Sequence, residues 1–185
     1  MKKYLITSPK FYTDESTVFR DKLEKQLKRY QPDFVLFRDK LNTNYHVLAK
    51  DFMDICLKFQ TIKSFIHTDV ELAKKFHAHG VHLPSHASKS IQKAKSLGLE
   101  VIISTHTYAE VFMAEELGAD YVTYSPIFDT PDKGEPKGVE DLQKLLQISK
   151  VKVFALGGIT SKKEIIKVAK TNVYGFASIG YFVRD

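Results

Sequence analysis

A double glycine in the last fifth of the chain is the feature that points most directly to chemistry. Gly157 and Gly158 follow the apolar run 153–156 and precede Ser161, which can cap the helical pattern 162–169. Glycines at this place leave backbone N–H groups uncovered beside the positive end of a helix dipole, and phosphate groups bind to such an arrangement. The same residues also suit a tight turn that binds no ligand.

Positively charged side chains follow other strand-like runs. Arg38 and Lys40 come after the run 34–37, at a spacing that lets both point to the same side. Lys133 and Lys137 lie in a polar loop. Four cations brought to one place would repel one another unless an anion lay between them, and a monophosphate or diphosphate substrate supplies that charge. The two loop lysines are also compatible with simple solvation.

Hydroxyl, imidazole and carboxylate groups end the remaining strand-like runs. Asp69 is a candidate Mg²⁺ ligand and is equally well placed as a helix N-cap. His82 lies within a strand-like run, where a hydrogen-bonded core histidine is the commoner outcome. The other candidate site residues are Ser104, His106, Thr130, Ile179 and Gly180.

Strand-like runs and amphipathic helical patterns alternate along the chain, and seven helices separate eight expected strands. The expected strands are 4–8, 34–37, 64–67, 81–83, 101–104, 121–124, 153–156 and 174–178. This order predicts an α/β fold, a compact (β/α)₈ TIM barrel that forms one domain over residues 1–185, with a doubly wound open sheet as the alternative. In such a barrel the groups that follow the strands meet at one rim, where glycine turns after the last two strands form a phosphate site.

The eighth helix is expected to be missing or much shortened, because the strand 174–178 lies close to Asp185. A barrel without this helix exposes apolar surface at its seam. That surface predicts either a homodimer or a short C-terminal segment that folds over the gap.

Composition excludes several classes of protein. Hydrophobic residues make up 43% of the chain and charged residues 27%, as in ordinary globular proteins, and no apolar run approaches the length of a membrane span. The net charge of +6 comes from lysines spread along helices, so we expect no nucleic-acid partner. A single cysteine, Cys56, is expected as a buried thiol. With no signal peptide recognisable, these features predict a cytoplasmic protein.

Six motifs together resemble the thiamine phosphate synthase and TenI family of barrels, and the resemblance covers nearly the full length. The motifs are FRDK (37–40), GVHL (80–83), STH (104–106), GADYV (118–122), SPIFDT (125–130) and ALGGI (155–159). The resemblance implies an enzyme that joins hydroxymethylpyrimidine diphosphate to thiazole phosphate, with Mg²⁺ as cofactor, and releases diphosphate.

The resemblance also implies roles for individual residues. Arg38 and Lys40 would hold the diphosphate, and Asp69 would bind Mg²⁺. Ser104 and Lys133 would face the diphosphate or its leaving oxygen. The thiazole phosphate would contact Thr130 and the cradle formed by Gly157, Gly158, Ile179 and Gly180, with His82 and His106 also lining the substrate site.

The chain departs from the synthase pattern at several positions: Leu36 replaces a glutamine, Thr68 an asparagine, Ala87 the second Mg²⁺ aspartate, Asp132 a threonine and Gly180 a serine. The phosphate half of the pattern is therefore better kept than the metal half. Two alternatives stay open. A TenI-like thiazole phosphate tautomerase would need His82 or His106 as its base, since Pro126 stands where that branch has a histidine. A non-catalytic, regulatory phosphate-binding protein is the other.

Overall fold

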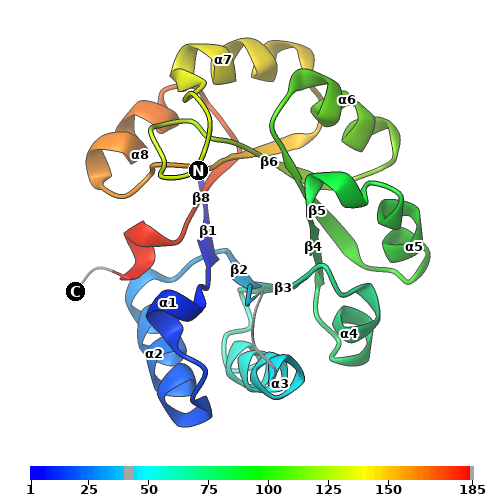
Figure 1. Cartoon of the computed structure of the whole chain (residues 1–185), viewed down its shortest axis with the longest axis vertical. Coiled ribbons are helices and arrows are strands. Elements are labelled where there is room, and N and C mark those ends of the chain that lie inside the picture. Colours follow the sequence, from blue (N-terminus) through cyan, green and yellow to red (C-terminus); the bar gives the residue numbers. More distant parts are fainter. Residues whose placement is uncertain (40–43, 184–185) are drawn as a thin grey trace.

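The computed structural model describes residues 1–39 and 44–183, and its eight strands close into a parallel barrel (Figure 1). Each strand pairs with the next, and β8 pairs with β1. The strands are β1 Lys2–Ile6, β2 Phe34–Phe37, β3 Lys63–His67, β4 Gly80–Leu83, β5 Glu100–Thr105, β6 Tyr121–Tyr124, β7 Lys152–Ala155 and β8 Gly175–Ser178. The predicted TIM barrel is confirmed.

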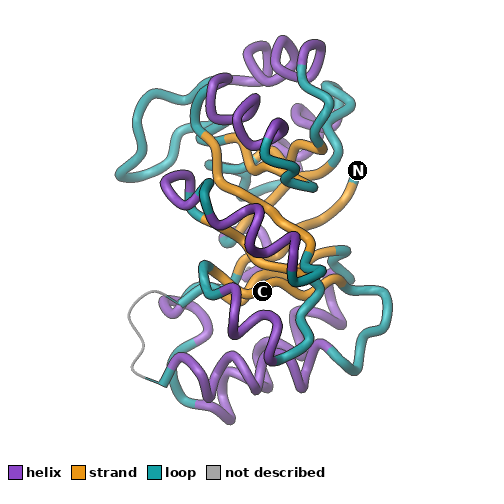
Figure 2. Tube along the Cα trace, turned by 90° about the vertical axis from the view of Figure 1, so that its right-hand side faces the viewer, coloured by secondary structure: helices purple, strands orange, loops and turns teal. Residues whose placement is uncertain are grey.

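Helices surround the strands, as the side view also shows (Figure 2). They are α1 Pro9–Tyr12, α2 Ser16–Tyr30, α3 Tyr45–Cys56, α4 Val70–Lys75, α5 Ser90–Ser96, α6 Tyr108–Glu116, α7 Gly138–Ile148 and α8 Lys162–Ala169, with 3₁₀ turns η1 Ser85–Ala87 and η2 Gly180–Val183. Two predicted N-caps are confirmed, because the Asp69 carboxylate accepts a hydrogen bond from Leu72 N and the Ser161 hydroxyl accepts one from Lys163 N. Helix α1 was not expected, and the 3₁₀ turn η1 lies just before α5, whose N-cap residue is Lys89.

Alternation along the strands divides the core into two layers. One cluster, which includes Tyr4, Phe34, Phe65 and Phe154, fills the inside of the barrel with aromatic rings. The residues between them belong to the larger cluster, which packs the outside of the strands against the helices. Because the side-chain period of a strand is two, the next inward residue after each inner core residue lies at the carboxyl rim.

The gap after β8 is covered by η2 rather than left open. Phe182 is fully buried, stacks on Phe176 at a centroid distance of 5.8 Å and meets the Tyr30 ring of α2 edge-on at 5.4 Å. In the described part of the chain no α-helix follows β8, as predicted. Of the two outcomes expected for the seam, the structure shows the short segment that folds over it, and the homodimer stays a prediction.

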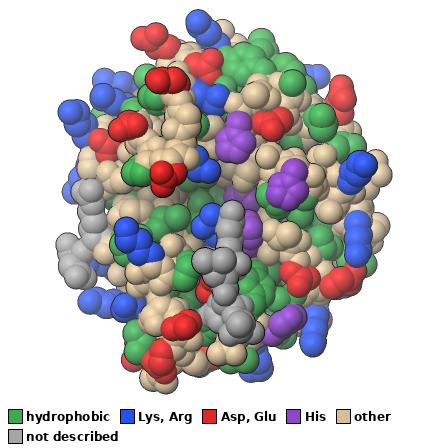
Figure 3. Space-filling model, viewed as in Figure 1, with side chains coloured by type: hydrophobic (Ala, Val, Ile, Leu, Met, Phe, Trp, Pro, Cys, Tyr) green, Lys and Arg blue, Asp and Glu red, His purple; other side chains and the backbone are tan. Residues whose placement is uncertain are grey.

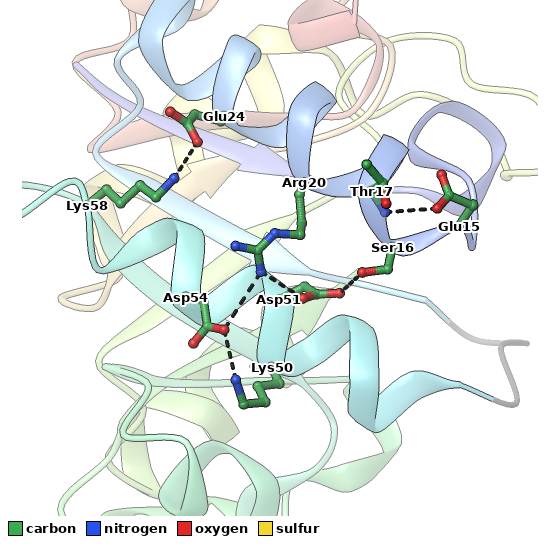
Figure 4. A network of polar contacts seen from close by, with 9 residues as sticks. All are labelled: Glu15, Ser16, Thr17, Arg20, Glu24, Lys50, Asp51, Asp54 and Lys58. Atoms are coloured by element: carbon green, nitrogen blue, oxygen red, sulfur yellow. Dashed lines mark hydrogen bonds and ion pairs between the residues drawn. The ribbon is translucent and has the colours of Figure 1, made fainter.

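A network of charged groups ties α2 to α3, the helices that follow β1 and β2 (Figure 4). The guanidinium of Arg20 lies 2.8 Å from Asp51 and 3.7 Å from Asp54, and the Ser16 hydroxyl donates to Asp51 at 2.6 Å. Lys58 pairs with Glu24 at 2.6 Å. Ion pairs at the surface contribute little to stability because solvent screens them, so the network chiefly fixes how the two helices lie against each other.

Two other expectations concern the cysteine and membrane-spanning helices. Cys56 is buried as predicted, and burial raises the pKa of its thiol. Among residues 1–39 and 44–183, no helix is long and apolar enough to cross a membrane.

Candidate functional site

A cavity of about 270 Å³ opens at the carboxyl ends of the strands. Most of the predicted site residues line it: Arg38, His82, Ser104, His106, Thr130, Lys133, Gly157 and Ile179. They come from six different strands or the loops that follow them, so the barrel unites residues far apart in the sequence. Several histidine side chains, with lysines or arginines beside them, lie toward the middle of the face seen in Figure 3.

The remaining predicted residues are placed differently. Gly158 and Gly180 belong to the turns beside the cavity but do not line it. Asp69 caps α4 and does not line it either. Lys40 lies outside the described residues. Lys137 does not line the cavity: its ammonium group lies 5.1 Å from the centre of the ring of Tyr124, which belongs to the outer core cluster.

A second hollow, of about 410 Å³, lies outside the barrel beside α1 and α2. Its lining includes Lys10, Lys22 and Lys25, and no strand contributes to it. The cavity at the barrel mouth is the smaller of the two, but it is the one that gathers groups from many strand ends, as active sites of this fold do.

The glycine turn after β7 is fixed by close backbone contacts. Gly157 and Gly158 have φ angles of +98° and +66°, which side chains rarely adopt. A Cβ atom on Gly158 would lie 2.6 Å from the carbonyl oxygen of Asp129, and one on Gly157 would lie 2.7 Å from Cα of Pro126. Both glycines are therefore required by the packing of this turn against the loop that follows β6, the long loop at the upper left of Figure 2.

The turns after β7 and β8 together offer backbone donors. Within the described residues, the N–H groups of Gly157, Gly158, Ile179 and Gly180 donate no hydrogen bond. The Ser178 hydroxyl donates to the carbonyl oxygen of Ile159 at 2.7 Å and so joins the two turns. Such uncovered N–H groups near the start of α8 can bind an anion.

Two cations line the cavity on different sides. Arg38 follows β2 and is partly buried; burial lowers the pKa of its guanidinium, whereas the neighbouring Asp39 raises it. An arginine stays charged under all ordinary conditions. Lys133 reaches the cavity from the exposed loop between β6 and α7. The positive charge of both groups suits an anionic ligand.

His82 bonds to protein groups at both ring nitrogens. Its Nδ1 lies 2.8 Å from the Tyr4 hydroxyl, and its Nε2 lies 3.0 Å from Oγ of Ser104. Burial, with a smaller contribution from the positive charges of His67 and Arg38, lowers the pKa of His82 from 6.5 to about 3. His82 is therefore a neutral, hydrogen-bonded histidine of the barrel core, and neither nitrogen is available as a base.

His106 keeps one ring nitrogen for the cavity. Its Nδ1 lies 3.1 Å from the carbonyl oxygen and 3.3 Å from Oγ of Ser125. In the tautomer that donates Nδ1–H to this carbonyl oxygen, Nε2 is an acceptor. The backbone N–H of His106 donates to the Glu110 carboxylate at 2.6 Å, which fixes the start of α6. His106 is thus better placed than His82 to accept a proton from a ligand.

The described residues offer little for a metal ion. Asp69 Oδ1 accepts the Leu72 N–H at 2.8 Å, and residues 1–39 and 44–183 hold no group of three histidine, cysteine, aspartate or glutamate side chains suited to a metal. Mg²⁺ prefers six oxygen ligands in near-octahedral geometry. A single carboxylate that also caps a helix does not fit a magnesium site made by the protein alone.

Sequence reasoning missed several residues that line the cavity. They are Ile6, Leu36 as a lining residue, Pro84, Ser85, Ser125, Pro126 and Leu156, whereas His67, which also lines the cavity, follows a predicted strand and was expected at the rim. A signal for some of them was available, since Ile6 and Leu156 stand two positions after Tyr4 and Phe154 of the inner core. The missing step was to know which residue of each strand faces inward.

Comparison with known proteins agrees with this architecture. The family model described as thiamine monophosphate synthase matches residues 3–182. A putative thiamine-phosphate synthase 2 of Aquifex aeolicus is 33% identical over 98% of this chain and 97% of its own length. The thiamine-phosphate synthase of Lactococcus lactis is 32% identical over 80% of this chain and 73% of its own length.

A solved structure gives the same result. The thiamine phosphate pyrophosphorylase from Pyrococcus furiosus superposes with a TM-score of 0.81 and 26% identity, covering 96% of this chain and 85% of that one. The predicted family is thereby confirmed. A parallel barrel with this rim, matched by the family model over almost its whole length, belongs to the thiamine monophosphate synthase family.

Proposed function

We propose that this chain is a thiamine phosphate synthase that joins hydroxymethylpyrimidine diphosphate to thiazole phosphate in the cavity at the barrel mouth. The observation that carries the proposal is the pairing of two cations and a hydroxyl, Arg38, Lys133 and Ser104, with the uncovered N–H groups of the two glycine-bearing turns. One set suits a diphosphate and the other suits a monophosphate.

In the proposed reaction the thiazole nitrogen forms a bond to the methylene carbon of the pyrimidine. The bond from that carbon to the diphosphate oxygen breaks, and its electron pair leaves with the diphosphate. Negative charge grows on the leaving oxygen as positive charge grows on the pyrimidine. Arg38 and Lys133 lower the barrier by stabilising this negative charge, and Ser104 can donate a hydrogen bond to it. The turn at Gly157 and Gly158 holds the thiazole phosphate in place.

Mg²⁺ bound at Asp69 stays a prediction. The donor set described above fits such a site poorly, so no step of the proposed mechanism depends on the ion, and the charge of the leaving group is balanced by Arg38 and Lys133. Lys40 would add to this charge by the family resemblance.

The test is the formation of thiamine phosphate from the two substrates, with Mg²⁺ present, and with each of the three components left out in turn. The proposal predicts product only when both organic substrates are present. Failure to form product, while thiazole phosphate still binds in calorimetry, would leave a non-catalytic binding protein.

A tautomerase of thiazole phosphate is the second candidate, and the free acceptor nitrogen of His106 favours it. This activity moves a proton without releasing diphosphate. It would be detected as exchange of a thiazole phosphate proton with deuterium from the solvent. Replacement His106→Gln would abolish that exchange, whereas His82→Gln would not, since both nitrogens of His82 are already bonded.

A further inference from the structure

Three side chains from three strands form an unbroken chain of hydrogen bonds that runs from the barrel core to the cavity. Tyr4 of β1 contacts His82 of β4 at 2.8 Å, and His82 contacts Ser104 of β5 at 3.0 Å. Tyr4 is fully buried and does not reach the cavity, His82 is 3% exposed, and Ser104 lies at the cavity wall.

The direction of the chain is set at its buried end. The Tyr4 hydroxyl has one hydrogen-bond partner among the described residues, Nδ1 of His82. A hydroxyl can donate one hydrogen bond, and a buried O–H group left without an acceptor is unfavourable. The Tyr4 hydroxyl therefore donates, and Nδ1 accepts.

The position of the hydrogen on the His82 ring then sets the direction of the hydrogen bond to Ser104. A neutral imidazole carries a single N–H group, so an accepting Nδ1 leaves the hydrogen on Nε2. Burial keeps the pKa of His82 low and that of Tyr4 high, in agreement with a neutral ring and a protonated phenol. Nε2–H donates to Oγ of Ser104, and the hydroxyl hydrogen of Ser104 has no acceptor within the described residues.

We propose that Tyr4 and His82 are positioning residues that turn the hydroxyl hydrogen of Ser104 toward the cavity, where it donates to an anionic oxygen of the ligand. This inference rests on the proposed function for the identity of that oxygen, a diphosphate oxygen of the pyrimidine substrate. Ser104 thus serves as a hydrogen-bond donor, because a serine whose oxygen accepts from His82 cannot pass its proton to that histidine.

The reverse direction has a distinct structural consequence. If Ser104 donated to Nε2, the hydrogen of His82 would lie on Nδ1 and point at the Tyr4 oxygen, and the phenolic hydrogen would be buried with no acceptor. The Tyr4→Phe replacement removes the group that forbids this arrangement, because a phenylalanine ring places no donor at Nδ1.

The direct test is the tautomer of His82 in the ligand-free protein, read from long-range ¹H–¹⁵N correlations of protein labelled with [¹⁵N]histidine. The His82 signals are assigned from their loss in His82→Gln. We expect the Nε2–H form in the wild type and a population of the Nδ1–H form in Tyr4→Phe. An Nδ1–H or doubly protonated ring in the wild type at neutral pH would overturn the proposal. This readout does not depend on any enzymatic activity.

The effect on function is tested by a double-mutant cycle. Tyr4→Phe should lower kcat/KM for diphosphate release by about tenfold in the wild-type background, the usual effect of losing one hydrogen bond to a charged group. It should have no further effect in a Ser104→Ala background. Tyr12→Phe is the matched control, since the buried Tyr12 hydroxyl has no hydrogen-bond partner among the described residues and lies outside the barrel; it should leave kcat/KM unchanged.

Equal losses from Tyr4→Phe in the two backgrounds would show that Tyr4 acts only through packing and would overturn the proposal. If the wild type released no diphosphate, the proposed function would fail, and the same cycle would be measured as the affinity for inorganic diphosphate. A tenfold weakening that disappears with Ser104→Ala would then still support the role of Tyr4 and His82, and its absence would refute it.

Discussion

The two halves of the cavity offer different kinds of chemical group to a ligand. The half formed by β6, β7 and β8 offers backbone N–H groups, among them those of Gly157 and Gly158 at positive φ, together with Thr130 and Lys133. The half formed by β2 to β5 offers side chains, of which His82 already bonds to Tyr4 and Ser104. Asp69, beside this half, caps a helix and does not line the cavity.

The difference bears on which half the proposed ligand would use. Backbone donors without a partner among the described residues are available to a ligand, whereas a carboxylate that caps a helix has a structural role whether or not a metal binds. In the proposed synthase the first half would therefore hold the phosphate of the thiazole substrate, and the second would contribute chiefly through Arg38 and Ser104.

The largest loss of activity should come from replacing Lys133, which lies in the loop between β6 and α7. Lys133→Ala should lower kcat/KM by about 10²–10³-fold, because it removes a charge that stabilises the leaving group. Lys137→Ala is the matched control, since Lys137 lies on the same loop but contacts the Tyr124 ring outside the cavity. Equal losses in steady-state assays of the two variants would contradict the placement of Lys133 at the site.

The glycine turn should be the next most sensitive. Gly158→Ala should destabilise the protein by about 1–3 kcal/mol through the unfavourable φ alone, with an added clash against the carbonyl oxygen of Asp129. It should also weaken the binding of thiazole phosphate. Gly118→Ala isolates the φ term, because Gly118 has φ +85° with open space around it. Urea unfolding would measure the loss of stability, and calorimetry the loss of affinity for thiazole phosphate. Identical results for Gly158→Ala and Gly118→Ala would contradict the close packing of the turn at Gly158.

Acid should destabilise the protein through His82. Its pKa in the folded protein is about 3, below the ordinary value of about 6.5. Between these values the unfolded chain binds the extra proton, so the free energy of unfolding falls as the pH drops, by up to about 1.4 kcal/mol for each pH unit.

The variant His82→Gln should flatten this dependence between pH 6 and 4, whereas replacement of the exposed His86 should not. Urea unfolding at a series of pH values measures the slope. An unchanged slope in His82→Gln would mean that the buried ring is not the group responsible.

The smallest effect is expected at Asp69. Asn is as good an N-cap as Asp, so Asp69→Asn should keep the melting temperature, and it should reduce turnover less than Lys133→Ala does. Turnover of Asp69→Asn measured at increasing Mg²⁺ concentrations tests this. Turnover that is abolished in the variant and restored by high Mg²⁺ would contradict the prediction, because it would show that the carboxylate holds the ion.

Much of the fold could be predicted because it depends on local patterns. The sequence shows apolar runs of strand length and helix caps such as Ser161. Accordingly, β2, β6 and α8 have the predicted bounds. The contents of the site were harder to predict. Arg38 and Lys133 follow strands, Ser104 lies at the end of one, and all three were found on that ground.

Other features depend on pairing between distant strands. The contact of His82 with Tyr4 needs the barrel to be closed, and the placement of Lys137 outside the cavity depends on how its loop packs on Tyr124. Neither follows from spacing in one sequence, since both contacts join residues whose mutual distance is set by the tertiary fold.

The most direct test of the proposed synthase is the stoichiometry of its two products. Diphosphate and thiamine phosphate should be measured together in one reaction of the wild-type protein, with Arg38→Ala as the impaired comparison. The account predicts equal amounts of both products, formed only when the two substrates are present, and a far slower reaction in Arg38→Ala. Diphosphate released without thiamine phosphate, or no release at all, would contradict it.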